Sequence, residues 1–204
     1  LIPFETSREN LLETTRFFRD LEYAEAERTA LERLIETAEQ SRDEISFRLQ
    51  LAENLRKAGE KESAARALAD LIERFPKNYG VLTETENFFW EMGKPDDSVR
   101  VLQAARKVAR GRYAYQIDRT LAQRFYALGN TREAARVLLA LHAENPTDED
   151  VFGELTDIFV RTDNQAALRK TFSETIAASK KSELEPRDFS RRAERLRKKM
   201  VSPF

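Results

Sequence analysis

The sequence predicts an all-α protein, a right-handed α-solenoid of about five helix-turn-helix repeats closed by a C-terminal capping helix. Residues 51–76 recur 70 positions later as residues 121–146, with nine identical positions. Glycines recur near the same place in three copies, at Gly59, Gly93 and Gly129, with spacings of 34 and 36 residues. Hydrophobic residues make up 41% of the chain and charged residues 35%, which is typical of amphipathic helices with one solvated face.

Each repeat is expected to be a pair of helices. Gly59 ends the first helix of the best-defined pair, because glycine adopts the left-handed conformation without a Cβ clash. Pro76 ends the second helix, since it has no N–H to donate. The first unit lacks both signals, and the fifth has Asp163 at the glycine position, as expected of terminal repeats with one neighbour. The expected units are residues 6–44, 45–78, 79–114, 115–148 and 149–182.

Capping signals predict where several helices begin. Ser41 and Glu44 have the spacing of a capping box, which predicts a helix that starts at about Arg42. Thr6 and Glu9 have the same spacing at the first helix. These signals mark helix starts inside the first two repeats.

Residues 183–204 are expected to be a polar linker followed by a basic amphipathic helix. Phe189, Ala193, Leu196 and Met200 recur at spacings of 4, 3 and 4 and form one apolar face. We interpret this helix as a cap on the last repeat; the alternative is an arm for nucleic acid, an acidic lipid surface or an acidic partner. Seven basic against two acidic residues give a local charge of 7 − 2 = +5, from Arg187, Arg191, Arg192, Arg195, Arg197, Lys198 and Lys199 with Asp188 and Glu194.

A period of 34 residues, with one glycine and one closing proline per unit, resembles the tetratricopeptide repeat. The resemblance covers nearly the whole chain and is strongest over residues 45–146. It implies an α-solenoid that mediates protein–protein contacts, and its motif of side-chain sizes carries no catalytic residue. One subclass of the family holds the C-terminal carboxylate of chaperone peptides with lysines and asparagines. Leu49, Glu53 and Asp157 stand at such positions here, which departs from that pattern.

The residues indicate no enzyme, cofactor or metal site. The chain has no cysteine, no metal-ligand spacing and no glycine-rich nucleotide motif. His142 is its one histidine, and we interpret it as a partly exposed helical residue. Many of the carboxylates lie four residues from a lysine or arginine, which is typical of a solvated, salt-bridged helix face rather than of an acid/base pair.

The first helices of the repeats supply the candidate binding surface. If Leu51, Ala52 and Leu55 face the paired helix, other side chains of the same first helix point away from it. In a stack of repeats, the first helices would line one groove with these side chains. Apolar anchors with hydrogen-bonding groups beside them suit an extended or helical peptide. Alternatively, Trp90 and Tyr126 are wedges between neighbouring helices. The candidate peptide-binding residues are Arg56, Asn87, Trp90, Arg119, Gln123 and Tyr126.

The net charge and the start of the chain bear on which partners and which cellular location we expect. A formal charge of −1 and a pI of about 6.1 favour neither nucleic acid nor an anionic membrane as a partner of the whole molecule. No apolar run has the length of a membrane span, so we expect a soluble protein of the cytoplasm, periplasm or exterior. The chain starts at Leu1, which suggests processing or a segment of a longer protein. The alternative functions are a structural spacer in such a protein and an RNA- or membrane-associated module using the basic helix.

Overall fold

The fold is entirely helical in the part of the chain that can be described. The computed structural model describes residues 7–181 and, further on, residues 191, 194 and 198. Ten helices and no strand occur within residues 7–181, which confirms the predicted all-α class. The chain divides into two compact units, Leu1–Val108 and Ala109–Phe204.

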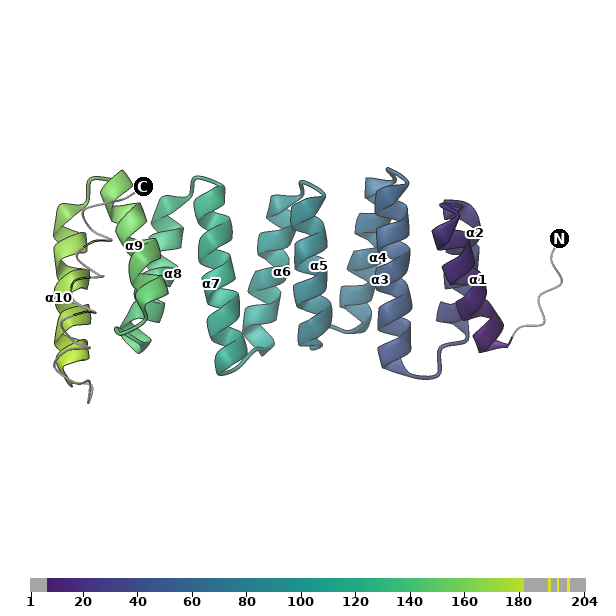
Figure 1. Ribbon diagram of the computed structural model, residues 1–204, viewed down its shortest axis with the longest axis horizontal. Coiled ribbons are helices and arrows are strands. Elements are labelled where there is room, and N and C mark those ends of the chain that lie inside the picture. Colours follow the sequence, from purple (N-terminus) through teal and green to yellow (C-terminus); the bar gives the residue numbers. More distant parts are fainter. Residues whose placement is uncertain (1–6, 182–190, 192–193, 195–197, 199–204) are drawn as a thin grey trace. The chain divides into compact units, whose positions relative to one another are not determined.

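Unit 1 (residues 1–108) holds three helix pairs. In Figure 1 they follow one another in chain order from purple to teal, and each helix packs on the next. The two helices of a pair are joined by a turn of three residues, which makes them antiparallel neighbours. The helices are α1 (Arg8–Asp20), α2 (Ala24–Glu36), α3 (Ser41–Lys57), α4 (Lys61–Arg74), α5 (Tyr79–Glu91) and α6 (Pro95–Val108).

Unit 2 (residues 109–204) repeats this arrangement with two pairs. Helix α9 packs on both α8 and α10, so the second pair stacks on the first. Asn130 caps α8 by accepting a hydrogen bond from the Glu133 amide at 3.4 Å. The helices are α7 (Arg112–Ala127), α8 (Thr131–Glu144), α9 (Glu149–Arg161) and α10 (Gln165–Lys181).

Small residues sit where paired helices meet. Ala52 and Ala64 are fully buried on α3 and α4, and so is Leu68 beside them. A side chain of one carbon lets two helices approach closely, while leucines fill the space around the contact. The second unit has the same arrangement at Ala122, Ala134 and Leu138, which belong to one core cluster with residues of α9. The repeated sequence therefore builds the same core twice.

All five turns within pairs share one backbone conformation. Glu22 (φ 58°) and Asp163 (φ 50°) adopt the left-handed region that Gly59 (φ 82°), Gly93 and Gly129 also occupy. The next residue closes each turn onto the helix, as in the Tyr23 N–H to Phe18 carbonyl bond of 2.9 Å. The terminal repeats, which lack the glycine, thus keep the turn of the others. Equivalent bonds join Glu60 to Leu55, Lys94 to Phe89, Asn130 to Phe125 and Asn164 to Phe159.

Two predicted caps are wrong. Helix α3 begins at Ser41 itself after Gln40, and no side chain caps it. Glu44 is buried and instead accepts hydrogen bonds from Arg48 at 2.9 Å and pairs with Arg74, because two guanidinium charges attract its carboxylate more strongly than a cap amide. At α1 the cap is Ser7 rather than Thr6. The capping helix expected within residues 183–204 lies, apart from three positions, outside the described residues.

Candidate functional site

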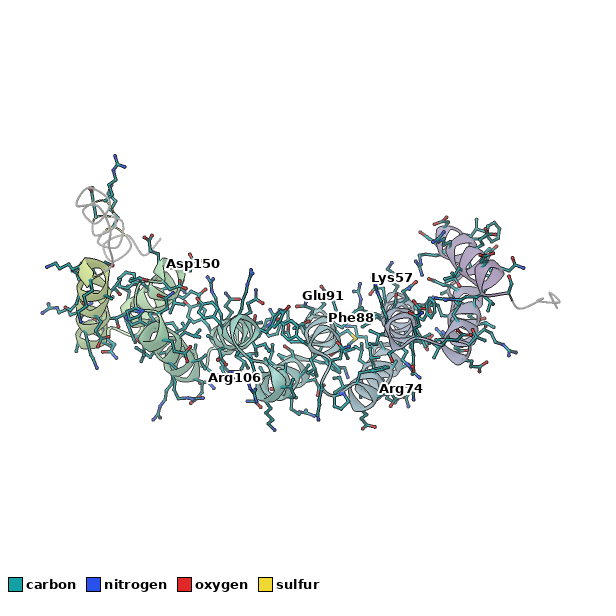
Figure 2. All side chains as sticks on the ribbon, turned by 90° about the horizontal axis from the view of Figure 1, so that it is seen from below. Lys57, Arg74, Phe88, Glu91, Arg106 and Asp150 are labelled. Carbon is teal, nitrogen blue, oxygen red and sulfur yellow. The ribbon has the colours of Figure 1, made fainter. Side chains whose placement is uncertain are left out.

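A cavity lies in unit 1 on the face formed by the first helices of its repeats. Its volume is about 800 Å³, which is within the range of ligand pockets. Lys57 and Phe88, which line this cavity, lie on the same side of unit 1 as Glu91, while Arg74 lies on the opposite side (Figure 2). The lining residues are Arg19, Glu22, Ala24, Glu27, Ser46, Leu49, Gln50, Glu53, Asn54, Lys57, Ala58 and Phe88.

One end of the cavity is a hydrogen-bonded network between two repeats. Glu27 is buried on α2, and its Oε1 accepts from Arg19 Nε at 2.6 Å. Its Oε2 accepts from Asn54 Nδ2 at 2.8 Å, and the same amide reaches the Ala24 carbonyl at 3.0 Å. Arg19 also donates to Gln50 Oε1 at 2.6 Å. Arg19 thus compensates the charge of the buried Glu27 carboxylate, and the network joins α1, α2 and α3 into one wall of the cavity.

The other end carries an ion pair along α3. Glu53 lines the cavity and accepts two hydrogen bonds from Arg56, at 2.6 and 2.8 Å. These bonds from Arg56 hold the pKa of Glu53 below its usual value. Lys57 Nζ lies 3.6 Å from the same carboxylate. Arg56 itself is not among the lining residues, so it acts here by holding Glu53.

Helix α5 contributes an aromatic wall that the sequence prediction missed. Asn87 is exposed and Trp90 half-buried, and neither lines the cavity. Phe88, between them, does. The signal was present in the repeat period, because Phe88 is 34 residues after Asn54, which also lines this cavity. Arg19 and Gln50 carried no comparable signal in the sequence.

In unit 2 the predicted residues lie together and bind acidic side chains of the next repeat. Arg119 on α7 donates to Glu154 Oε1 on α9 at 2.9 and 3.1 Å and to Asp150 at 3.2 Å. Gln123 donates to the same Glu154 oxygen at 3.0 Å. Both donors therefore connect the first helices of adjacent repeats.

Tyr126 makes a similar connection one turn further along α7. Its hydroxyl donates to Asp157 on α9, and the Arg161 guanidinium lies 5.7 Å from its ring centre. Burial and the Asp157 hydrogen bond raise the pKa of Tyr126. At the start of α7, burial and a hydrogen bond to Asp148 raise the pKa of Tyr115 to about 12, so both phenols stay protonated donors at neutral pH.

A cleft of about 250 Å³ opens beside this row. Gln123 and Tyr126 form one side of it and the apolar Leu138 and Ile158 another, so it offers an apolar surface next to hydrogen-bonding groups. The remaining lining residues are Ala122, Gly153, Glu154 and Asp157. Trp90 and Tyr126 belong to different units, and a shared surface for them stays a prediction.

His142 is buried, and its expected partial exposure is wrong. Only 2% of it is exposed, and neither ring nitrogen has a hydrogen-bond partner. Glu174 Oε2 on α10 lies 3.8 Å from Nε2, too far for a hydrogen bond. Burial lowers the pKa of His142, although Glu174 and Asp148 partly oppose it, so the ring is neutral at neutral pH. The period of the repeats predicted that His142 lies on a helix, but not that its side chain is enclosed there.

No cluster of three potential ligands for a metal ion occurs among the residues that the structure describes. Within the same part of the chain, no helix has both the length and the apolar composition to cross a membrane.

Comparisons with known proteins agree with this geometry. Residues 48–78 match the family model of the tetratricopeptide repeat. No curated protein matches the sequence. A tetratricopeptide-repeat protein from Parabacteroides merdae ATCC 43184 is similar in structure, with a TM-score of 0.57, 12% identity and coverage of 95% of this chain and 73% of that one.

Two further solved structures share the fold. The MamA protein has a TM-score of 0.54 and 10% identity, and the match covers 87% of this chain and 96% of MamA. The repeats of a putative kinesin light chain from Podosopora anserina have a TM-score of 0.52 and 15% identity, with 89% and 100% covered. Residues 48–78 are therefore a tetratricopeptide repeat, and the chain is a helical-repeat protein with the tetratricopeptide fold.

Proposed function

We propose that the chain is a non-catalytic scaffold that binds a peptide or protein segment on the faces formed by the first helices of its repeats. The observation that carries this proposal is the 800 Å³ cavity of unit 1, which combines the apolar side chains of Leu49 and Phe88 with polar groups. Tetratricopeptide-repeat proteins generally serve as protein-interaction scaffolds, which supports the same function.

The cavity favours a peptide with an apolar anchor over a strongly charged ligand. Its buried carboxylate Glu27 is already paired with Arg19, and Glu53 is paired with Arg56. A charged ligand would have to displace these pairs, and exposed ion pairs contribute little to affinity. Apolar side chains that enter a desolvated pocket contribute most of the binding energy of such interfaces. Leu49 and Phe88 are therefore the proposed anchor site, and Gln50 and Lys57 are proposed to set the register.

The residues predicted from the sequence keep a place in this proposal. In unit 2, the bonds to α9 fix the rotamers of Gln123 and Tyr126 before a ligand arrives, which reduces the entropy that binding costs. We propose the 250 Å³ cleft beside them as a second, smaller contact for the same kind of ligand. The proposed peptide-binding residues from the sequence are Arg56, Asn87, Trp90, Arg119, Gln123 and Tyr126.

One observation favours a structural spacer as the second candidate. Arg119, Gln123 and Tyr126 are all bonded to α9, as residues that serve only to pack adjacent repeats would be. An RNA- or membrane-associated module would rely on the basic segment after residue 183, which lies almost wholly outside the described residues.

Selection from a phage-displayed library of random short peptides tests the proposal. Peptides that bind the intact protein are screened against Leu49→Lys, which places a charge in the cavity wall, and against Leu139→Lys, a matched change at an exposed position on α8. We expect enriched peptides to carry apolar side chains, to lose binding to Leu49→Lys and to keep it with Leu139→Lys. Failure to enrich any peptide, or equal binding to both variants, would favour the spacer.

A further inference from the structure

The first repeat exposes a compact apolar patch. Phe17 is 59% exposed, Leu21 49% and Tyr23 62%, and these are three of the six large hydrophobic residues most exposed among those described. They lie within seven residues, at the end of α1 and the turn to α2. Phe17 and Leu21 are four residues apart on one helix face, so their side chains are neighbours, and Tyr23 follows in the turn. Each of the two aromatic side chains leaves roughly 100 Å² in water.

The repeat shows what this patch is built to contact. Glu22 and Gly59 hold equivalent places 37 residues apart, so Phe17 corresponds to Asn54 and Tyr23 to Glu60. Asn54 donates to the Ala24 carbonyl of the preceding repeat at 3.0 Å. Glu60 pairs with Arg28 of the preceding repeat at 2.6 Å. The equivalents of Phe17 and Tyr23 in the second repeat therefore pack against the repeat before it.

The fifth repeat agrees with this assignment at the position of Phe17. Ile158, the equivalent of Phe17 in the fifth repeat, is buried and lines a cleft with Ala122 and Leu138 of the fourth. The position of Leu21 varies between repeats: Met92 is buried in the third repeat, whereas Leu128 is 44% exposed in the fourth. Phe17 and Tyr23 thus stand at repeat-docking positions, and together with Leu21 beside them they form the exposed patch that is called here the N-terminal face.

Two exposed carboxylates flank Phe17 along α1, and the exposed Arg16 directly precedes it. Glu13 precedes Phe17 by four residues and Asp20 follows it by three, so both flank Phe17 on α1. Both are exposed, and neither makes an ion pair with a described residue. Two N-terminal faces brought together across a twofold axis would set these carboxylates against each other. The flank disfavours a symmetric dimer and favours an amphipathic helix with basic residues beside its apolar stripe.

We propose that the N-terminal face binds the basic amphipathic segment, residues 186–200, of a second copy of this chain. The sequence of this segment carries the complementary pattern, with Phe189 and Leu196 on an apolar stripe and Arg192 and Lys199 beside it. The contact joins different surfaces of the two copies, and such heterologous contacts continue from copy to copy. The chain therefore assembles head to tail through this contact, independently of any peptide on the first-helix cavity.

Sedimentation of the full chain over a range of concentrations tests the assembly. We expect the mass to rise with concentration beyond two copies, and added salt to shift the association to higher concentration. Phe17→Glu combined with Leu21→Glu should raise the concentration of half-association at least tenfold. Leu139→Glu, at an exposed leucine on α8, is the matched control and should leave it unchanged.

Charge exchange identifies the occupant. Glu13→Arg with Asp20→Arg should weaken association, and so should Arg192→Glu with Lys199→Glu. A mixture of these two variants should associate again, because each supplies the charges that the other lacks. A single copy at every concentration, association unaffected by Phe17→Glu, or no recovery in the mixture overturns the proposal. If the variants of residues 192 and 199 lower the melting temperature and leave the mass unchanged, the segment caps its own last repeat instead.

Discussion

At the scale of single residues, the first and fifth repeats carry backbone strain, because a residue other than glycine adopts the left-handed conformation in their turns. Glu22 and Asp163 adopt a left-handed conformation in which a Cβ meets the following carbonyl, at a cost of about 1–2 kcal/mol. Asp tolerates this region better than Glu, because its short side chain bonds the local backbone. The strain is therefore greater at Glu22. The sequence could predict the turn at Gly59, Gly93 and Gly129 but not its persistence without glycine, since packing of the paired helices imposes it.

Glu22→Gly is expected to stabilise unit 1 by about 1 kcal/mol, because glycine removes the clash. Asp163→Gly should give a smaller gain. Urea unfolding followed by circular dichroism measures both. Glu25→Gly, in the first turn of α2, is the control and should destabilise by up to about 1 kcal/mol, as glycine does within a helix. A loss of stability in Glu22→Gly would show that the Glu22 side chain, rather than its conformation, matters at this turn.

His142 should make unit 2 sensitive to mild acid. Burial lowers the pKa of His142 in the folded protein. As the pH falls below about 6.5, the ordinary pKa of histidine, the unfolded chain therefore binds a proton before the folded protein does. Stability is then complete above that value and falls as pH drops from about 7 to about 5. His142→Leu should flatten the melting temperature over this window. An equally steep decline in the variant would assign the acid sensitivity to other groups.

At the scale of the helix pair, burial alternates sharply along one helix. Leu138 faces the core of unit 2 and is buried, whereas its neighbour Leu139 is 40% exposed on the same helix. The 3.6-residue period predicts this alternation, and the repeated sequence predicts which leucine is inside. Pairing between repeats was less predictable. Glu154 accepts from Arg119 one period earlier in the chain, and nothing in the sequence distinguishes it from other carboxylates on α9.

Leu138→Ala is expected to destabilise unit 2 by about 2–5 kcal/mol, because it leaves a cavity in a packed core. Leu139→Ala should change stability by no more than about 0.5 kcal/mol, as surface substitutions do. Thermal or urea unfolding measures the two side by side. Equal effects from both changes would place α8 in a different register from the one described.

At the scale of the whole molecule, the repeat period predicted the all-α fold and the five helix pairs found within residues 7–181. It did not predict the individual wall residues. Phe88 was missed in favour of Asn87 and Trp90, because the period fixes which helix lines a surface but a single step along a helix turns a side chain by about 100°. In this chain, the repeat pattern therefore predicts which helix lines a surface better than it predicts which residue does.

Trp90→Ala and Tyr126→Ala distinguish recognition from packing in the two units. If these side chains bind a selected peptide, each change should weaken affinity by about 30- to 1000-fold and leave the melting temperature within a degree or two. If they only fill space between helices, the melting temperature should fall and the folded fraction should bind as before. Calorimetric titration and thermal unfolding of the same samples give both values.

The central claim is that the cavity lined by Leu49 and Phe88 anchors a peptide. Its most direct test is the dissociation constant of one selected peptide, measured by calorimetric titration against the parent protein and Phe88→Ala. The account predicts an affinity about 30- to 1000-fold weaker for Phe88→Ala, with an unchanged circular dichroism spectrum. An unchanged dissociation constant in a folded Phe88→Ala protein would contradict it.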